Sequence, residues 1–156
     1  MNDKWISFAI RIQSISDTKS RYKSGLFIDG KILLVHENNG TWSLPGGWCD
    51  VDQSVATNIV KEVKEETGFA VSAVKLIAVQ DWRKHNVTNY AYGVVKVFVM
   101  CKYDGGKFQE NIETTEIAFF DENSIPENLA VEKCTREQIL MCFKSFNHPD
   151  SPTLFD

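Results

Sequence analysis

Residues 46 to 69 constrain the fold of this chain more than any other segment, because they combine glycine punctuation with a concentrated set of acids. Gly46-Gly47 permits a backbone turn that other residues resist. Gly68 stands where the C-terminal cap of a helix favours a left-handed residue. The segment therefore predicts a glycine turn immediately followed by a helix with a defined end.

Three glutamates fall on one face of this predicted helix. At about 100° per residue, Glu62, Glu65 and Glu66 span about a third of the circumference. Beside them runs an apolar stripe that faces the core, formed by Ala56, Ile59, Val60 and Val63. Like charges four residues apart destabilise a helix by a few tenths of a kcal/mol, so these acids are kept for another reason. A solvated face balanced by lysines is the alternative, but the glycines favour a site that holds divalent cations against a phosphate chain.

The segment resembles the Nudix box, a pattern of glycines and glutamates at fixed spacing. Gly47, Glu62, Glu65, Glu66 and Gly68 match its glycines and its metal-binding and catalytic glutamates. Gln53 and Lys61 stand where the family usually has a glutamate and an arginine that bond to each other as scaffold. The resemblance therefore implies an intact set of functional acids and a weaker glutamine–lysine contact behind them.

Residues 24 to 156 also resemble a bacterial Nudix subgroup of ADP-ribose or CDP-choline pyrophosphatases, including the Lys31–Val35 strand and the closing Pro152–Asp156 segment. This implies a magnesium-dependent pyrophosphohydrolase that cleaves a nucleoside diphosphate linked to another moiety. Its products would be a nucleoside monophosphate and a phosphorylated compound. The alternatives are a non-catalytic Nudix-like module that binds a nucleotide sugar and regulates a partner, and a house-cleaning nucleoside triphosphate pyrophosphatase.

The chain has 156 residues, 43% of them hydrophobic, which suits one domain with a substantial core. We expect a Nudix domain over residues 21–156 after an extension over residues 1–20. The extension has apolar residues at helical spacing, which predict an amphipathic helix: Trp5, Phe8, Ala9, Ile12 and Ile15. This helix either packs on its own domain or joins a homodimer interface. Subgroup members carry a longer helical segment here, which these residues resemble in shortened form.

The composition limits the classes of partner that the protein is expected to bind. A net charge of −4 without a basic stripe argues against nucleic acid. The absence of a long apolar run or a secretion signal argues against a membrane and predicts a cytoplasmic protein. The four cysteines form no C-x-x-C and predict reduced thiols. Because three carboxylates would repel a diphosphate substrate, the sequence predicts a Mg²⁺ cofactor, with Mn²⁺ as the substitute.

Strand and helix signals alternate along the rest of the chain. A hairpin is expected over residues 24–28 and 31–36, turning at Asp29-Gly30. Further strands are expected over residues 71–81, 91–102 and 116–120, with Asp104-Gly105-Gly106 ending the second of these. Thr135 to Gln138 forms a capping box ahead of a last helix. These elements predict an α+β protein, a three-layer α/β/α sandwich around a mixed β-sheet, which is also the fold that the resemblance implies.

The resemblance implies roles for the acids. Metal ligands would be Glu62, Glu65 and Glu66, together with the backbone carbonyl of Gly46. Glu62 is the first candidate for the general base, followed by the two acids before a predicted strand, Glu113 and Glu116. A solvated loop is the alternative interpretation for both of these later acids.

Substrate contacts are predicted from aromatic and hydrogen-bonding residues near the strand ends. The candidates are Trp48, Trp82, Arg83, His85 and Tyr90, with Tyr92 beside them. Aromatic residues more often fill a core than stack on a base, so burial in the core is the alternative for the rings.

Overall fold

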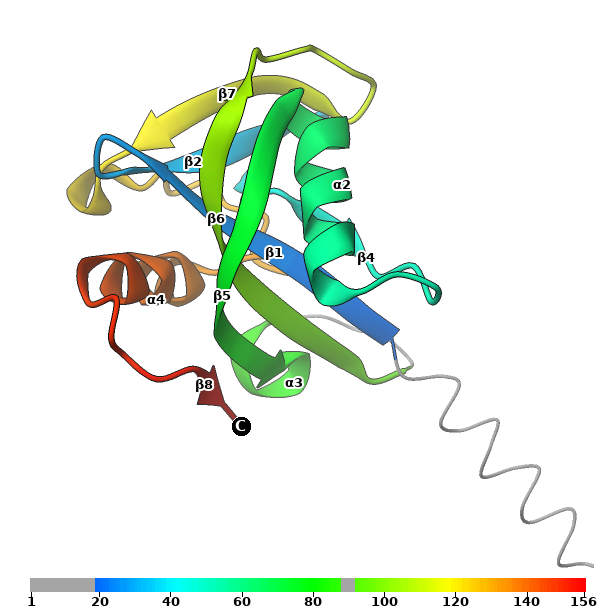
Figure 1. The fold of residues 1–156 in the computed structure, drawn as a ribbon, viewed down its shortest axis with the longest axis vertical. Helices are drawn as coiled ribbons and strands as arrows, with labels where there is room; N and C mark the ends of the chain where they lie inside the picture. The colour runs from blue at the N-terminus through cyan, green and yellow to red at the C-terminus, as the bar shows by residue number, and fades with distance from the viewer. Residues whose placement is uncertain (1–18, 88–91) are drawn as a thin grey trace, which may run out of the picture.

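The computed structural model describes residues 19–87 and 92–156, which form a mixed sheet with helices on both faces (Figure 1). Its strands are β1 (Lys19–Ile28), β2 (Lys31–Glu37), β3 (Trp42–Ser43), β4 (Gly46–Trp48), β5 (Phe69–Asp81), β6 (Val94–Gly106), β7 (Thr114–Phe120) and β8 (Leu154–Phe155). The helices are α2 (Val55–Thr67), α3 (Trp82–His85), a 3₁₀ turn over Glu122–Ser124, and α4 (Arg136–Asn147). The predicted N-terminal helix and any pairing through it lie outside the described residues.

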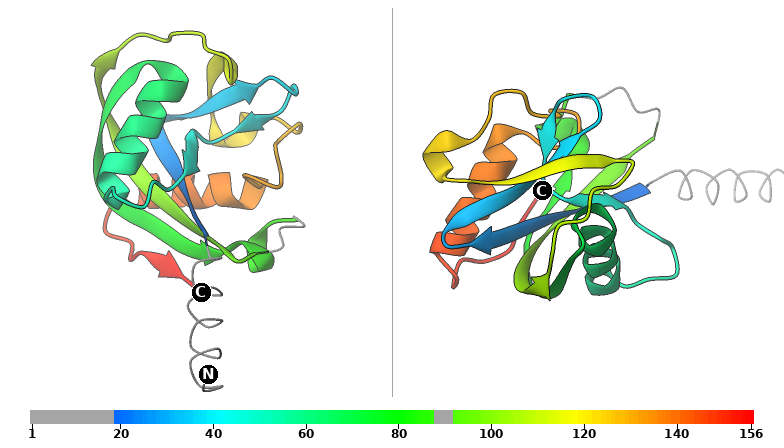
Figure 2. Two further views of the ribbon diagram at one scale, coloured as in Figure 1. Left: turned by 90° about the vertical axis from the view of Figure 1, so that its right-hand side faces the viewer. Right: turned by 90° about the horizontal axis from the view of Figure 1, so that it is seen from above.

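The strands follow the order β3-β2-β1-β6-β5-β8, while β4 pairs with β1 and β7 with β2. The pairs β1–β6 and β5–β8 are parallel, and the other pairs are antiparallel, so the sheet is mixed as expected. Figure 2 shows β4 lying beside α2, which brings the glycine segment against the acidic helix.

Two apolar clusters on opposite faces of the sheet form the core. Along β6, Val97, Val99 and Cys101 pack with α2, whereas the alternate residues Phe98 and Met100 pack with α4. This alternation follows from the two-residue period of a strand, which turns successive side chains to opposite faces. The helix–sheet–helix layers therefore confirm the predicted sandwich.

The hairpin between β1 and β2 turns at Asp29-Gly30, where φ is +52° and +75°. Two consecutive positive φ values are characteristic of the tight turns that join twisted antiparallel strands, so this prediction is confirmed. The strand before the turn begins at Lys19, five residues earlier than residues 24–28 indicated. This extension matters because its alternate residues are basic.

The second long strand ends at the predicted segment, although it runs a few residues past residue 102. Asp104-Gly105-Gly106 forms the last three residues of β6, and Gly105 and Gly106 pair with Ala70 and Phe69 of β5. The two glycines have positive φ values of +143° and +92°, which distort the strand where it ends.

Both long helices are capped by the residues that the sequence indicates. Gly68 ends α2 at φ +80°, and its N–H donates to the carbonyl of Lys64. At the start of α4, the Thr135 side chain accepts from the Gln138 N–H, and the Gln138 side chain accepts from the Thr135 N–H. These reciprocal bonds satisfy backbone donors that a helix leaves unpaired at its first turn. In the described part of the chain, no helix is long and apolar enough to cross a bilayer.

Replacing Thr135 by alanine should destabilise the protein by about 1 kcal/mol, because the helix loses the side-chain acceptor at its N-cap. The midpoint of urea denaturation measures the loss, provided that the slope of the transition is unchanged. Thr135→Ser keeps the hydroxyl and should retain most of the stability. Equal losses in both variants would contradict a capping role.

Candidate active site

Gly46 and Gly47 form the short strand β4 rather than the predicted turn ahead of the helix. They pair with Lys23 and Tyr22 of β1, and α2 begins only at Val55, after a loop. Gly46 has φ +152°, and a Cβ there would overlap the carbonyl oxygen of Tyr22. Gly46 is therefore needed for close packing of a strand, which is a different reason from the expected bend.

The second glycine leaves room for an acidic side chain of the helix beside β4. A Cβ on Gly47 would collide with the carboxylate of Glu62. On the same strand, the Gly46 N–H donates to Oε2 of Glu66 at 3.0 Å. Glu66 is thus bonded to the glycine backbone, and the carboxylate of Glu62 lies next to it.

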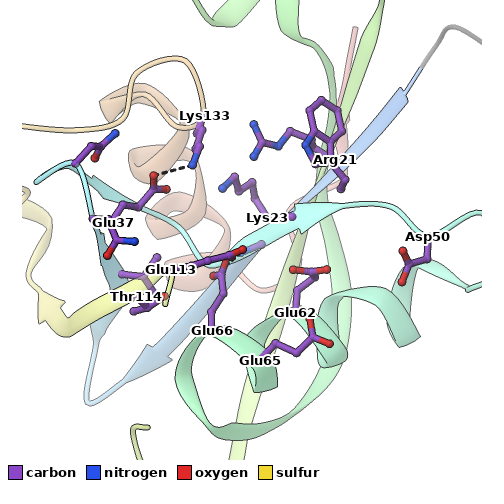
Figure 3. Close-up of a pocket in the computed structure, with 16 residues that line it drawn as sticks. Arg21, Lys23, Glu37, Asp50, Glu62, Glu65, Glu66, Glu113, Thr114 and Lys133 are labelled. Atoms are coloured by element: carbon purple, nitrogen blue, oxygen red, sulfur yellow. Dashed lines mark hydrogen bonds and ion pairs between the residues drawn. The ribbon is translucent and has the colours of Figure 1, made fainter. Parts of the chain in front are cut away.

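A cavity of about 600 Å³ opens over this contact (Figure 3). Its acidic side includes all three predicted helix glutamates, Glu62, Glu65 and Glu66, together with Glu113. A volume of this order suits a small-molecule ligand. The structure therefore gathers the predicted acids into one concave site.

Burial and crowding make two of these acids unusually reluctant to ionise. Burial raises the pKa of Glu66 to about 7, although the nearby Lys23 and the Gly46 N–H act in the opposite direction. Burial also raises the pKa of Glu62, with a further contribution from the negative charge of Glu65. A cation bound here would relieve both effects by favouring the charged carboxylates.

The donor set fits Mg²⁺ or Mn²⁺ by chemical type, since carboxylate oxygens are hard ligands. Among the described residues, no three histidine, cysteine or acidic side chains already converge on one point as a complete cage. Mg²⁺ does not require such a cage, because it commonly binds through one or two carboxylates, with water and substrate phosphate completing the coordination. The acids of α2 could therefore hold the ion together with a phosphate ligand.

Comparison with known proteins matches this geometry to one family. The sequence pattern of the NUDIX domain covers residues 24–139 of the chain. The chain belongs to the Nudix family.

Two crystal structures resemble the whole fold. One is an ADP-ribose pyrophosphatase from Streptococcus suis 89-1591, which is 46% identical, with 88% of this chain and 98% of that chain covered and a TM-score of 0.82. The other, a UDP-X diphosphatase, is 29% identical, with 99% and 75% covered and a TM-score of 0.82.

A curated relative from Bacillus subtilis (strain 168), YjhB, is 39% identical over 139 residues, or 88% of this chain, and its name provisionally assigns it ADP-ribose pyrophosphatase activity. The chain spans 66% of that relative, slightly less than two thirds of its length.

The expected contact between Gln53 and Lys61 of the Nudix box is wrong. Lys61 Nζ instead bonds Oδ2 of Asp50 at 2.6 Å, and Oε1 of Gln53 is buried without a hydrogen-bond partner. Asp50 is held in place because its N–H donates to the side chain of the buried Asn58 at 2.9 Å. The scaffold of the Nudix glutamates thus uses an acid three residues earlier than the usual position, and because the pair it forms is exposed, its contribution to stability is small.

The two later candidates for the general base separate in the structure. Glu113 lines the cavity, and the loop that carries it is held to the end of α2, where the Asn111 side chain donates to the carbonyl of Glu66 at 2.9 Å. Glu116 is exposed on β7 opposite His36 and is not among the described residues that line the cavity.

The substrate candidates also separate. Trp48 lines the cavity, where the guanidinium of Arg21 lies 4.6 Å from its ring centroid. The structure does not bring Trp82, Arg83 and His85 to this cavity: they form α3, in which Trp82 is buried, Arg83 pairs with Asp81, and His85 bonds Asp156. Tyr90 lies outside the described residues.

The sequence did not lead us to expect that one side of the cavity is basic. Arg21, Lys23 and Lys133 line it, and Figure 3 shows them on the opposite side from Glu62 and Glu65. Arg21 and Lys23 are buried, and their positions two residues apart place both on one face of β1. The alternation of basic residues from position 19 to 23 was the available signal, but it required the strand to start before residue 24.

The raised pKa of Glu66 predicts a pH-dependent stability in metal-free buffer. The unfolded chain loses this proton near pH 4.5 and the folded chain near pH 7, so the free energy of unfolding should fall as pH rises through that window. Glu66→Gln should reduce this fall, whereas Glu65→Gln, on an exposed residue of the same helix, should keep it. Urea denaturation at pH 5 and pH 7.5 measures the difference, and an unchanged pH dependence in Glu66→Gln would contradict the assigned burial.

Proposed function

We propose that the protein is a Mg²⁺-dependent pyrophosphohydrolase that cleaves a nucleoside diphosphate linked to another group, with Mn²⁺ able to substitute. The products would be a nucleoside monophosphate and the phosphorylated second group. The observation that carries this proposal is the placement of Glu62 and Glu66 against the glycine strand in a cavity of ligand size. Family membership and relatives named as pyrophosphatases of nucleotide derivatives support it.

Each wall of the cavity has a separate task in this reaction. Glu62, Glu65 and Glu66, with the Gly46 carbonyl, would hold the ion, which supplies positive charge to the diphosphate and favours deprotonation of water. Glu62 is our candidate for the general base that accepts the proton of the attacking water, because its carboxylate lies in the cavity beside the glycine strand. Glu113 reaches the same cavity and is the second candidate.

The bond that breaks is the P–O–P link. Water attacks one phosphorus atom, its proton passes to the general base, and the bridging oxygen leaves with the other phosphoryl group. Because little covalent chemistry is required of the protein, positioning and charge stabilisation would supply most of the rate enhancement. The rigid contact between α2 and β4 suits that task.

The substrate panel should contain ADP-ribose, CDP-choline, NADH and an oxidised nucleoside triphosphate, each with and without Mg²⁺. We expect Mg²⁺-dependent release of a nucleoside monophosphate from a diphosphate-linked compound, measured by chromatography of the products. Glu62→Gln should lower kcat by about a hundredfold or more. Glu116→Gln, the matched change outside the cavity, should leave kcat unchanged.

Other outcomes separate the rival functions. Turnover of the triphosphate alone would identify a house-cleaning enzyme. Ligand binding with only a slow background hydrolysis, equal in the protein and Glu62→Gln, would identify a non-catalytic regulatory module.

A further inference from the structure

Lys133 lies on the side of the cavity away from α2, where its ammonium group pairs with the carboxylate of Glu37. Its Nζ is 2.6 Å from Oε2 of Glu37, and their side chains are 29% and 17% exposed. The dashed line in Figure 3 joins these two groups above the α2 glutamates. An ammonium group has three N–H donors, and the described contacts use one of them at Glu37.

The backbone that carries Lys133 is fixed by a second lysine. Lys96 is fully buried on β6, and its Nζ donates to the carbonyls of Glu132 at 3.1 Å and Lys133 at 2.8 Å. Burying an ammonium group is costly unless its donors find acceptors. Lys96 therefore stabilises one conformation of this segment, at the point where Lys133 leaves the main chain.

The same segment is attached to β3 at its other end. The Ala130 N–H donates to the carbonyl of Trp42 at 2.9 Å, and the Trp42 N–H donates to the carbonyl of Asn128 at 3.0 Å. The Lys133 N–H donates to the carbonyl of Ala130 at 2.8 Å, which closes a turn. The backbone from Asn128 to Lys133 is thus fixed by hydrogen bonds at several points. The side chain of Lys133 therefore enters the cavity from a fixed position, and such preorganisation favours contacts with a ligand.

We propose that Lys133 is a substrate-binding residue whose ammonium group contacts a non-bridging oxygen of the diphosphate from the side opposite α2, with Lys96 as its positioning residue. This inference rests on the proposed function, because it assumes a diphosphate in the cavity. A diphosphate carries negative charge on both of its phosphoryl groups. Lys133 provides a fixed positive charge for the group that lies farther from the helix glutamates.

Methylenediphosphonate tests the contact directly, since it presents a diphosphate with a bridge that cannot be cleaved. Calorimetry in the presence of Mg²⁺ should give a Kd that is ~10- to 100-fold weaker for Lys133→Met than for the wild type, because a charge-assisted hydrogen bond is lost. Lys133→Arg retains the charge and should stay within a few-fold of the wild type. Lys31→Met is the matched control, because Lys31 pairs with Asp121 and lies outside this cavity, and its Kd should not change.

A double-mutant cycle tests the role of Lys96. Lys96→Met should weaken binding in the wild-type background and have no further effect in Lys133→Met, because it acts through the position of Lys133. With a hydrolysed substrate, both single variants should raise KM more than they lower kcat. A purely structural role of Lys96 would change the urea midpoint and leave the Kd unchanged, which would overturn its assignment.

The results separate this inference from the proposed function. If the wild type hydrolyses the substrate panel but Lys133→Met binds methylenediphosphonate as tightly as the wild type, the role of Lys133 is refuted and the function stands. If the wild type hydrolyses nothing, the function fails, and a Lys133-dependent Kd still supports the contact. A wild type that does not bind the probe overturns the inference.

Discussion

The site depends on the close approach of α2 to the glycine strand β4. A side chain at Gly46 would overlap the backbone of Tyr22, so β4 can pair with β1 here only with glycine at this position, and a side chain at Gly47 would displace the carboxylate of Glu62. That approach brings the Gly46 N–H within 3.0 Å of Glu66 and buries acids that would otherwise remain solvated. Apolar packing of Ile59 and Val63 against the sheet holds the helix there, because their burial stabilises the folded state.

Local signals predicted much of this architecture. Some features depend only on residues that are close together in the sequence, so the local structure they produce can be predicted before the fold is known. These features are the capping residues, the Asp29-Gly30 turn and the helical spacing of the glutamates. The resemblance to the Nudix box also implied the three-layer α/β/α sandwich, and the structure confirms this fold. The double glycine shows the limit of this approach, since glycine serves both in turns and in close backbone packing, and the sequence does not distinguish the two uses.

Contacts between distant segments could not be predicted in the same way. Lys61 bonds Asp50 and not Gln53 because the side chain of Asn58 accepts from the Asp50 N–H and holds Asp50 beside α2. Lys133 meets Glu37 only because the segment after β7 returns to β3 and is held by Lys96. Both pairs depend on tertiary geometry, and nothing in the local residue pattern marks either partner. Arg21 and Lys23 were missed for a different reason, because the first strand was expected to start only at residue 24.

Divalent-cation binding decides whether the acids of α2, held against the glycine strand, form an ion site. Titration with Mn²⁺, followed by electron paramagnetic resonance, measures this without a substrate. We expect saturable Mn²⁺ binding in the wild type and in Glu116→Gln, and loss of that binding when Glu62 and Glu66 are both replaced by glutamine. Equal binding in all three proteins, or no binding in the wild type, would contradict it.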